Sequence, residues 1–428
     1  MTATPVRPTV DDMTDAAISP TRHVVILGGG VAGLELLIAL DNLARDRVSV
    51  TLVSSSPDFT YRPLTVAEPF SLGHAEHHPL QRFADDFGAR LVVDSCEEVI
   101  PDRAVIRCAG GEEIAYDDLV VAVGARTARP YTRAITFGEP GAHEALGGML
   151  ADAEDGYLKH IAFVVPSGSS WPLPLYELAL MTAAEVRGMG IDDVHVSLIS
   201  TEPTPLRIFG TGASDTVAGL LADAGIEFIG GSHAAVEGQR LLLSPSDREL
   251  EAGRIVTLPL LLGPGLPGLP SDSNGFIPAD EHGRVPGWPD VFVAGDATTY
   301  PVKQGGIATQ QADAVAEVIA ARAGGVTAMT SHSPVLRGLL LTGGQTQFLR
   351  RELSDVHGNG DAAAHALWWP PSKIAGRYLS PYLLGRDEDE ILSAAPGPRR
   401  KVTIGHGLQG GDLRSTVDIH AVPAAEAV

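Results

Sequence analysis

The chain has 428 residues, more than a single hydrophobic core usually supports, so two or three domains are expected. Its formal net charge of −22 at pH 7 disfavours nucleic acid and anionic membranes as partners, because both are bound through clustered Lys and Arg. The 2 cysteines, Cys96 and Cys108, are spaced too widely for a CxxC redox pair and are too few for a zinc site. The chain shows no run of about 18 apolar residues and no hydrophobic signal core near its start, so a cytoplasmic protein without a transmembrane segment is predicted.

A strand, a glycine-rich loop, a helix and a second strand are predicted in succession at residues 23–27, 28–33, 34–44 and 48–53. The loop carries the GxGxxG pattern of dinucleotide-binding proteins. Gly28 allows the tight turn, Gly30 lets a pyrophosphate approach the backbone, and Gly33 permits close packing of the helix on the strand. Val31 and Ala32 lie at the helix N-terminus, where N–H groups and the helix dipole favour phosphates.

One part of this motif is missing, because no acidic residue follows the second strand. Ser54, Ser55 and Ser56 stand at the position that usually contacts the ribose, and a serine hydroxyl bonds more weakly than a carboxylate. Asp58 is a more distant candidate for the same contact. The ribose contact is therefore expected to be weaker than usual.

The same alternation continues along the chain, with strands predicted at 114–123, 161–165, 194–199, 226–229 and 291–294 and helices at 173–187, 211–224 and 307–321. The Gly- and Pro-rich run 263–270 is interpreted as a crossing between domains. We expect an α/β protein in which one Rossmann-like domain interrupts another, followed by a C-terminal layer. The expected divisions are a disordered tail at 1–21, a first domain at 22–135 and 264–325, a second at 136–263, and a C-terminal domain and tail at 326–428.

Four segments follow one another in a recognisable order: the 28–33 loop with Glu35, Tyr61-Arg62-Pro63-Leu64, YDDLVVAVGA around Gly124, and DVFVAGDA around Asp296. Together they resemble the pyridine nucleotide-disulfide oxidoreductase superfamily, in particular type II NADH dehydrogenases, sulfide:quinone oxidoreductases and ferredoxin reductases. The resemblance extends over about residues 22–325. It implies that the first domain binds FAD and that the inserted domain is similar to an NAD(P)-binding domain.

The resemblance also assigns roles near the flavin. Asp296, after Gly295, is expected to hydrogen-bond the ribityl chain of FAD, and the next helix points its N-terminus at the flavin ring. By position Lys303, Gln304 and Gly306 would lie at this helix start, with the fixed charge of Lys303 stabilising the reduced ring. The remaining FAD contacts implied by the resemblance are Arg62, Pro63, Cys96, through its backbone, and Gly124.

The missing cysteine pair excludes the dithiol chemistry of the disulfide reductases in this superfamily. Sulfide:quinone oxidoreductases also carry sulfur on cysteines, so that reaction is not expected here. Cys96 and Cys108 are interpreted as structural residues. Electrons are expected to pass directly between FAD and its partners.

The second module leaves two interpretations open, because its first strand leads into Ser167–Trp171 rather than into GxGxxG. In one, Gly168 and the serines still bind the diphosphate of NADH or NADPH, Trp171 stacks on a base or on the nicotinamide, and Glu202 contacts the ribose of NADH. Glu177, which corresponds to Glu35, belongs to the same candidate site. In the other, Trp171 and the prolines fill the pocket and the module is a scaffold.

Two other clusters are less specific. His74, His77 and His78 suggest a metal, but a solvated loop is favoured because no carboxylate–histidine pattern accompanies them. Residues 366–384 concentrate aromatic side chains in a chain with only 5% aromatics. One interpretation is a quinone channel or a peripheral membrane contact. The other, which we favour, is packing of the C-terminal layer or a homodimer interface.

The sequence thus predicts an FAD-dependent oxidoreductase that passes electrons from NAD(P)H through the flavin to a quinone-like or protein acceptor. The first alternative is an FAD oxidoreductase with a non-nicotinamide donor. The second is a non-catalytic flavoprotein that acts as a redox sensor or assembly partner.

Overall fold

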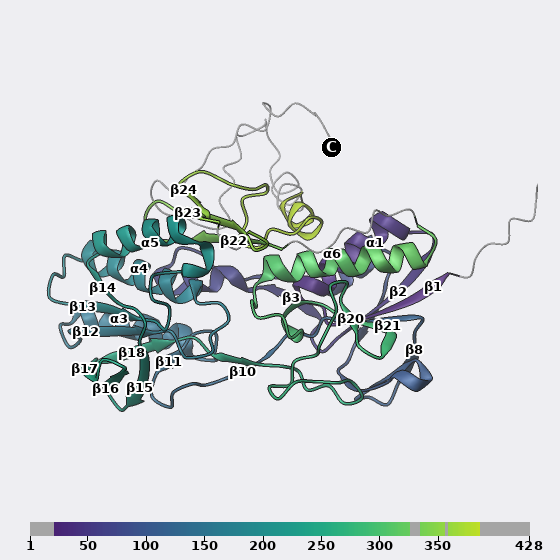
Figure 1. The fold of residues 1–428 in the computed structure, drawn as a ribbon, viewed down its shortest axis with the longest axis horizontal. Helices are drawn as coiled ribbons and strands as arrows, with labels where there is room; N and C mark the ends of the chain where they lie inside the picture. The colour runs from purple at the N-terminus through teal and green to yellow at the C-terminus, as the bar shows by residue number, and fades with distance from the viewer. Residues whose placement is uncertain (1–20, 326–333, 356–357, 386–428) are drawn as a thin grey trace, which may run out of the picture.

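A computed structural model of the protein describes residues 21–325, 334–355 and 358–385. Residues 1–20 of the tail expected at 1–21 lie outside the described part of the chain, as do residues 326–333, 356–357 and 386–428 of the C-terminal domain and tail expected at 326–428. The described residues form two lobes, each around a parallel sheet, with a smaller layer packed across one side of both (Figure 1).

The first lobe contains a six-stranded sheet in the order β20-β21-β9-β1-β2-β5. Its strands are β1 (Arg22–Leu27), β2 (Val48–Ser54), β5 (Arg90–Val93), β9 (Asp118–Val121), β20 (Arg284–Val285) and β21 (Trp288–Val293). Neighbouring strands run parallel except for β20 and β21. Leu27 is level with Val53 on one side and Val121 on the other, so these strands end at one edge. That edge is where open α/β sheets bind ligands.

Both faces of this sheet are covered, which explains why its strands are apolar throughout. Val24 and Ile26 face helices α1 (Val31–Ala44) and α6 (Gly305–Arg322), which pack against each other on one side (Figure 1). Val25 and Leu27 face the opposite side, where a small antiparallel sheet packs. Its strands are β6 (Cys96–Ile100), β7 (Val105–Cys108) and β8 (Glu113–Ala115).

The prediction of one strand at 114–123 is wrong. β8 ends at Ala115 and β9 begins at Asp118, because the chain leaves the small antiparallel sheet there and enters the central sheet. The apolar run is continuous in sequence although its two halves belong to different sheets.

The second lobe repeats the parallel pattern in a five-stranded sheet of order β11-β18-β12-β13-β14. Its strands are β11 (Ile135–Thr136), β12 (His160–Val164), β13 (His195–Ile199), β14 (Ile226–Ile229) and β18 (Arg254–Thr257), and its helices are α3 (Ala142–Glu154), α4 (Leu173–Gly188) and α5 (Thr211–Asp223). An antiparallel extension is formed by β15 (His233–Glu237), β16 (Arg240–Ser244) and β17 (Arg248–Glu251). The two lobes are joined by β10 (Arg126–Ala128) and β19 (Leu260–Leu262), which pair with each other.

The remaining elements are short. A hairpin, β3 (Asp58–Tyr61) with β4 (Glu76–Pro79), encloses the 3-10 helix η2 (Arg62–Phe70), and α2 (Leu80–Asp86) follows it. Further 3-10 turns are η3 (Pro101–Arg103), η4 (Arg207–Phe209) and η5 (Gly295–Ala297). The C-terminal layer contains β22 (Val335–Leu340), β23 (Gln347–Glu352) and β24 (Asp361–Ala363). The predicted α/β class with two Rossmann-like sheets and a C-terminal layer is confirmed.

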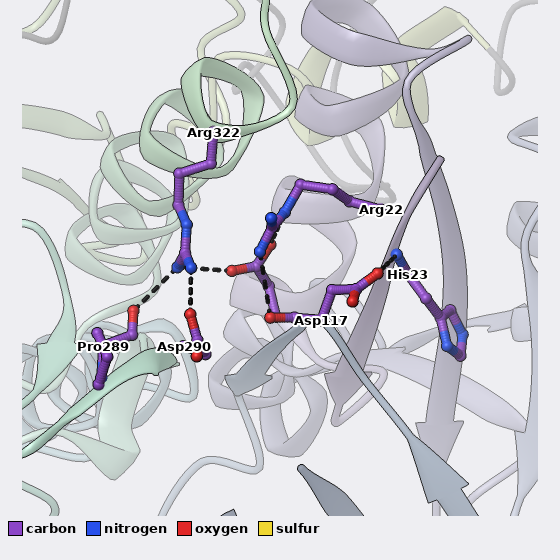
Figure 2. A network of polar contacts seen from close by, with 7 residues as sticks. Arg22, His23, Asp117, Pro289, Asp290 and Arg322 are labelled. Atoms are coloured by element: carbon purple, nitrogen blue, oxygen red, sulfur yellow. Dashed lines mark hydrogen bonds and ion pairs between the residues drawn. The ribbon is translucent and has the colours of Figure 1, made fainter. Parts of the chain in front are cut away.

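A buried carboxylate secures the edge of the first sheet that lies opposite the glycine-rich loop. Asp118, which is fully buried at the start of β9, pairs with Arg22 Nε at 2.8 Å and with Arg322 Nη1 at 2.7 Å. Arg322, at the end of α6, also donates to the Pro289 carbonyl at 2.9 Å and pairs with Asp290 on β21 (Figure 2). This aspartate of the YDDLVVAVGA segment therefore joins the starts of three strands to the end of α6.

Candidate functional site

The GxGxxG loop connects β1 to α1 at the carboxyl edge of the first sheet. Gly28 has a φ of +109°, and a Cβ there would lie 2.3 Å from the carbonyl oxygen of Ala122. A Cβ on Gly33 would lie 1.9 Å from the carbonyl oxygen of Gly28. Both positions therefore have room only for glycine, because the helix start, the loop and the neighbouring strand touch through their backbones.

Gly30 differs from its two neighbours in the motif, because a Cβ there would meet nothing within 4 Å. It is the N-cap of α1, and the N–H of Leu34 donates to its carbonyl at 2.9 Å. The N–H groups of Val31, Ala32 and Gly33 therefore precede the hydrogen-bonded ladder of the helix. Open space above free N–H groups at the positive end of a helix is a site for a pyrophosphate.

The end of β2 offers hydroxyl groups beside this loop. Ser54 is buried, and its Oγ accepts the N–H of Ser56 at 3.3 Å. Ser55 is exposed, and so is Asp58, which begins β3 and donates its N–H to the Ser56 hydroxyl at 3.1 Å. A ribose at this edge would meet serine side chains rather than a carboxylate.

Two valines are left unusually exposed along the same edge, on either side of the glycine-rich loop. Val93 ends β5 and is 52% exposed, and Val123 follows β9 and is 41% exposed. Beside Val123, Gly124 has a φ of +74° and open space around it. An extended ligand along this edge would remove both apolar side chains from water.

The Gly295-Asp296 turn follows β21 at this edge and touches both helices. Gly295 has a φ of +75°, and a Cβ there would lie 3.2 Å from the Cβ of Ala32 and 3.5 Å from that of Ala308. Asp296 makes no hydrogen bond within the described residues, and its pKa is raised by burial, against the opposing effect of Lys303. This carboxylate is partly exposed and is therefore free to accept a hydrogen bond from a ligand. A sugar hydroxyl would satisfy it.

Lys303 lies just before α6 and is 7% exposed. Its Nζ donates to the carbonyl of Thr298 and lies 4.0 Å from the centre of the Phe276 ring. Burial lowers the pKa of Lys303 to about 8, although Asp296 and Asp272 act in the opposite direction. With this pKa, Lys303 still carries a positive charge at neutral pH.

Gln304 caps α6 rather than pointing freely into the site. Its Oε1 accepts the N–H of Ile307 at 3.0 Å, and its Nε2 donates to the carbonyl of Arg337 on β22 at 3.1 Å. The two glycines that follow are closely covered, since a Cβ on Gly305 would lie 2.9 Å from Ile374 and one on Gly306 would lie 3.0 Å from Gln304. The start of α6 is therefore rigid, with its positive end at the ligand-binding edge.

Arg62, Pro63 and Cys96 lie on separate elements around this edge. Arg62 is exposed at the start of η2, Pro63 follows it and is partly buried, and Cys96 is partly buried at the start of β6. Just before η2, the Tyr61 hydroxyl is buried and accepts the N–H of Ile374 at 3.1 Å. The C-terminal layer therefore reaches the same region of the first lobe.

The corresponding helix start in the second lobe lacks the donors that α1 provides. Pro172 is the N-cap of α4 and Pro174 is its second residue, and proline has no N–H. The N–H of Leu175 donates to the Pro172 carbonyl at 3.0 Å. Two of the groups that would hold a pyrophosphate are absent, and a third is already bonded.

The loop that leads into α4 is also hydrogen-bonded within the protein. Gly168 has a φ of +86°, and the N–H of Ser169 donates to the carbonyl of Pro166 at 3.0 Å. The hydroxyl of Ser167 lies 2.8 Å from Nδ1 of His233 on β15. These contacts hold the loop against the antiparallel extension of the second sheet.

The larger side chains of the candidate nicotinamide site are engaged in the protein interior. Trp171 packs on Phe209, with 5.7 Å between the ring centres, beside the core of the second lobe. Glu202 Oε2 accepts the hydroxyl of the buried Tyr176 at 3.1 Å. Glu177 is 1% exposed and binds Lys373 through both carboxylate oxygens, at 2.6 and 2.7 Å. This arrangement matches the scaffold interpretation of the second module.

Two equivalent glutamates bind the C-terminal segment. Glu177 is the fifth residue of α4, and Glu35 is the fifth residue of α1. Glu35 is fully buried and accepts the N–H groups of Tyr378 and Leu379 at 2.8 and 2.7 Å. The segment from Lys373 to Leu379 therefore crosses from one lobe to the other.

Most aromatic side chains of the 366–384 region are partly buried against other parts of the protein. Trp368 contacts Phe348 edge-on, with 5.0 Å between ring centres, and its Nε1 donates to the carbonyl of Ser372 at 3.0 Å. Tyr382 packs on Phe83 of α2. Trp369 is the exception, because it is 60% exposed.

The described residues contain no group of three or more His, Cys, Asp and Glu side chains placed to hold a metal ion. The sequence favoured a solvated loop for the three histidines, but His77 and His78 lie on strand β4. His78 stacks on Phe59. None of the described helices is both long and apolar enough to cross a membrane.

Two Rossmann modules, of which the first carries the GxGxxG loop and the Gly-Asp turn at one edge of its sheet, define the architecture of two-domain nucleotide-dependent oxidoreductases. Comparison with known families agrees with this class. The chain belongs to the pyridine nucleotide-disulphide oxidoreductase family, whose model matches residues 22–316.

Two similar proteins are named for different redox systems. The chain is 26% identical over 309 residues to a sulfide-quinone reductase from Aquifex aeolicus (strain VF5), covering 65% of this chain and 69% of that one. It is 26% identical over 331 residues to the ferredoxin reductase component of a chlorobenzene dioxygenase from Cupriavidus sp. (strain PS12), covering 71% and 75%. The crystal structure of the Aquifex aeolicus sulfide:quinone oxidoreductase superposes with a TM-score of 0.71 at 20% identity, covering 87% of this chain and 91% of that one.

Sequence reasoning missed the residues that join the lobes. Lys373 lies 196 positions from Glu177, and no local pattern links a lysine in a Pro-rich segment to a helix in another domain. A buried glutamate inside an apolar helix face was the only available signal, since such a charge needs a partner.

Proposed function

We propose that this protein is an FAD-dependent oxidoreductase whose electron donor is not NAD(P)H. The contrast between the two helix starts supports this proposal. α1 has open space above Gly30 and unused N–H groups, whereas α4 begins with two prolines and a loop already bonded internally. The described residues therefore offer one dinucleotide cradle rather than two.

The residues around the first cradle fit FAD. The start of α1 would hold the pyrophosphate, Ser54 and Ser55 would meet the adenosine ribose, and Asp296 would accept a ribityl hydroxyl. Val93 and Val123 are apolar surface that the extended cofactor would cover. The partly buried Asp296 carboxylate, which accepts no hydrogen bond from the described residues, can accept one from a ligand hydroxyl group.

The chain contributes charge and rigidity to the reaction. When bound, FAD supplies the transfer of a hydride or of single electrons between a donor and an acceptor. The N-terminus of α6, fixed by the Gln304 cap, presents a positive dipole where negative charge develops on reduction. Lys303 adds a full positive charge below its pKa of about 8.

A quinone-like or protein acceptor remains part of the proposal. Two of the similar proteins are named for a quinone and for a ferredoxin system. In this chain Trp369 is exposed four residues before Lys373, and the nearby Ile374 covers the start of α6. An exposed indole on the segment that leads to Ile374 is a surface on which an aromatic acceptor can stack.

Anaerobic mixing with NADH and NADPH, followed through the visible absorbance of the bound flavin, tests the donor. We expect no bleaching within minutes by either nicotinamide and complete bleaching by dithionite. Rapid bleaching by one of them would refute the proposed donor class and identify that nicotinamide as the donor. A flavin that dithionite reduces but that no quinone or protein acceptor reoxidises would favour a non-catalytic redox sensor or assembly partner.

Substitution of two aspartates tests the flavin site: Asp296 follows the end of β21, and Asp290 lies near its start. Asp296→Ala removes the proposed ribityl contact, and the purified protein is expected to lose most of its flavin. Asp290→Ala, at the other end of the strand, removes only a partly exposed ion pair and should keep full flavin content. An Asp296→Ala variant with full flavin content would show that the site is assigned wrongly.

The acceptor surface is tested by Trp369→Ala. We expect slower reoxidation of the reduced flavin by a soluble quinone and an unchanged rate with ferricyanide. Tyr157→Ala is the matched control, since Tyr157 is 83% exposed in the second lobe. Equal quinone rates in both variants would exclude a role for Trp369.

A further inference from the structure

The two cysteines of the chain face each other across a hairpin. Cys96 on β6 and Cys108 on β7 are Cα partners in the antiparallel pair, with a register irregularity just after Cys96. The sequence separation of twelve residues concealed this pairing. Counting residues back from the hairpin turn does not predict that Cys96 faces Cys108, because the register shifts between Cys96 and Glu98.

The hydrogen bonds show which kind of pair this is. The N–H of Ala109 donates to the carbonyl of Ser95 at 2.8 Å, one residue beyond the cysteines, and the N–H of Cys108 donates to Glu112 at 2.8 Å. The cysteines therefore form a non-hydrogen-bonded pair, the closer of the two kinds, with Cα atoms about 4.5 Å apart. That spacing lies within the range of about 4.4–6.8 Å that disulfides occupy.

We propose that Cys96 and Cys108 form a reversible cross-strand dithiol–disulfide site that exchanges with small-molecule disulfides. Cys96 is partly exposed and Cys108 is fully buried, so Cys96 is the sulfur that a reagent reaches first. The site lies on the hairpin that covers the first sheet, on elements separate from the start of α6. The backbone of Cys96 lies near the edge proposed to bind FAD, but the thiol exchange uses neither the flavin nor the start of α6, so it is additional to the proposed flavin reaction.

The exchange proceeds in two balanced steps with oxidised glutathione as the reagent. The Cys96 thiol loses its proton to water, its sulfur attacks one glutathione sulfur, and one glutathione leaves as a thiolate that takes up a proton. The Cys108 sulfur, after losing its proton, then attacks Cys96 Sγ and releases the second glutathione in the same way. Two protein thiols are oxidised and one glutathione disulfide is reduced to two thiols.

The surroundings make this exchange slow. Burial and the neighbouring Cys108 raise the pKa of Cys96 to about 12, and burial with Asp94 and Glu112 raises the pKa of Cys108, against the effect of Arg90. Little thiolate is present at neutral pH, and thiolate is the attacking species. Exchange at this site is therefore expected to be slow at neutral pH.

The test is incubation of the native holoprotein with oxidised glutathione, followed by intact-mass measurement and thiol counting after denaturation. We expect both thiols to disappear, a mass loss of about 2 Da, no retained glutathione, and a raised melting temperature that dithiothreitol reverses. Cys108→Ser should instead retain one glutathione on Cys96, because the resolving thiol is gone.

Two results would overturn the proposal. One is a wild-type protein that retains glutathione on Cys96. The other is a wild-type protein that keeps both thiols under conditions in which Cys108→Ser becomes fully glutathionylated. Wild type and Cys108→Ser react with the same reagent through the same sulfur, that of Cys96. The comparison therefore separates a Cys96 thiol that glutathione cannot reach from a Cys96–Cys108 disulfide that cannot form. Flavin content of both proteins checks that Cys108→Ser is folded.

Discussion

The carboxylate of Glu177 and the ammonium group of Lys373 form a bidentate ion pair, with side chains that are 1% and 8% exposed, between α4 and the C-terminal segment. Burial raises the pKa of Glu177 and lowers the pKa of Lys373, and each partner opposes the shift of the other. The same carboxylate accepts the N–H of Leu341 at 2.9 Å. Three segments of the chain thus meet at one charge pair.

Removing either partner alone should strongly destabilise the protein. We expect Lys373→Met or Glu177→Leu to lower the free energy of unfolding by about 3–5 kcal/mol, because each leaves an uncompensated buried charge. The double variant should lose less than the two single variants together. The midpoint of urea unfolding measures this. Arg240→Ala, which breaks an exposed pair with Glu237, is the control and should change stability by about 0–1 kcal/mol. Strictly additive losses would contradict this account.

Two glycines of the same loop should separate binding from folding. Gly30→Ala adds a methyl group to open space, so the apoprotein should unfold at the wild-type temperature while flavin affinity falls, since the methyl group lies where the pyrophosphate would approach. Gly33→Ala places a Cβ 1.9 Å from a carbonyl oxygen and should destabilise the apoprotein itself. Melting temperatures without flavin, together with flavin titration, check both. If Gly30→Ala binds flavin as tightly as the wild type, the pyrophosphate does not bind at the start of α1.

The stability of the apoprotein should depend on pH through Lys303. Its pKa is lowered to about 8, whereas an unfolded lysine titrates near about 10.4. Between these values the unfolded state holds a proton that the folded state has lost, so stability rises with pH across this window. Lys303→Met lacks this term. The melting temperature of Lys303→Met should therefore exceed that of the wild type most at pH 7, and the difference should become smaller towards pH 10. A difference that does not change with pH would contradict the lowered pKa of Lys303.

The parallel strands and the first cradle were predictable because each depends on local sequence. An apolar run followed by Gly28, Gly30 and Gly33 fixes a turn and a helix start within a few residues, and the structure contains both. The boundary between β8 and β9 was not predictable, because the same apolar run serves two sheets. Asp118 gave a hint, since a charged residue inside an apolar run indicates a strand start or a buried pair.

The sequence predicted a Rossmann-like sheet in the second module, but it did not decide whether the module can bind a nicotinamide cofactor. Pro172 and Pro174 are visible in the sequence, yet their effect depends on where α4 begins. The position of Trp171 depends on Phe209, which lies in another segment. The cysteine pair likewise depends on the hairpin register, which a single irregularity decides.

The crossing of the C-terminal segment between Glu35 and Glu177 has a consequence for synthesis of the protein. Both lobes are complete in sequence by residue 325, but the segment that joins them lies at residues 373–379. Because domains fold as they leave the ribosome, the two lobes can form separately well before the contacts that fix their mutual position exist. Until then, Glu35 and Glu177 lack the partners that they bind in the finished protein. The nascent chain therefore passes through an interval in which its flavin-binding lobe is formed but not yet covered.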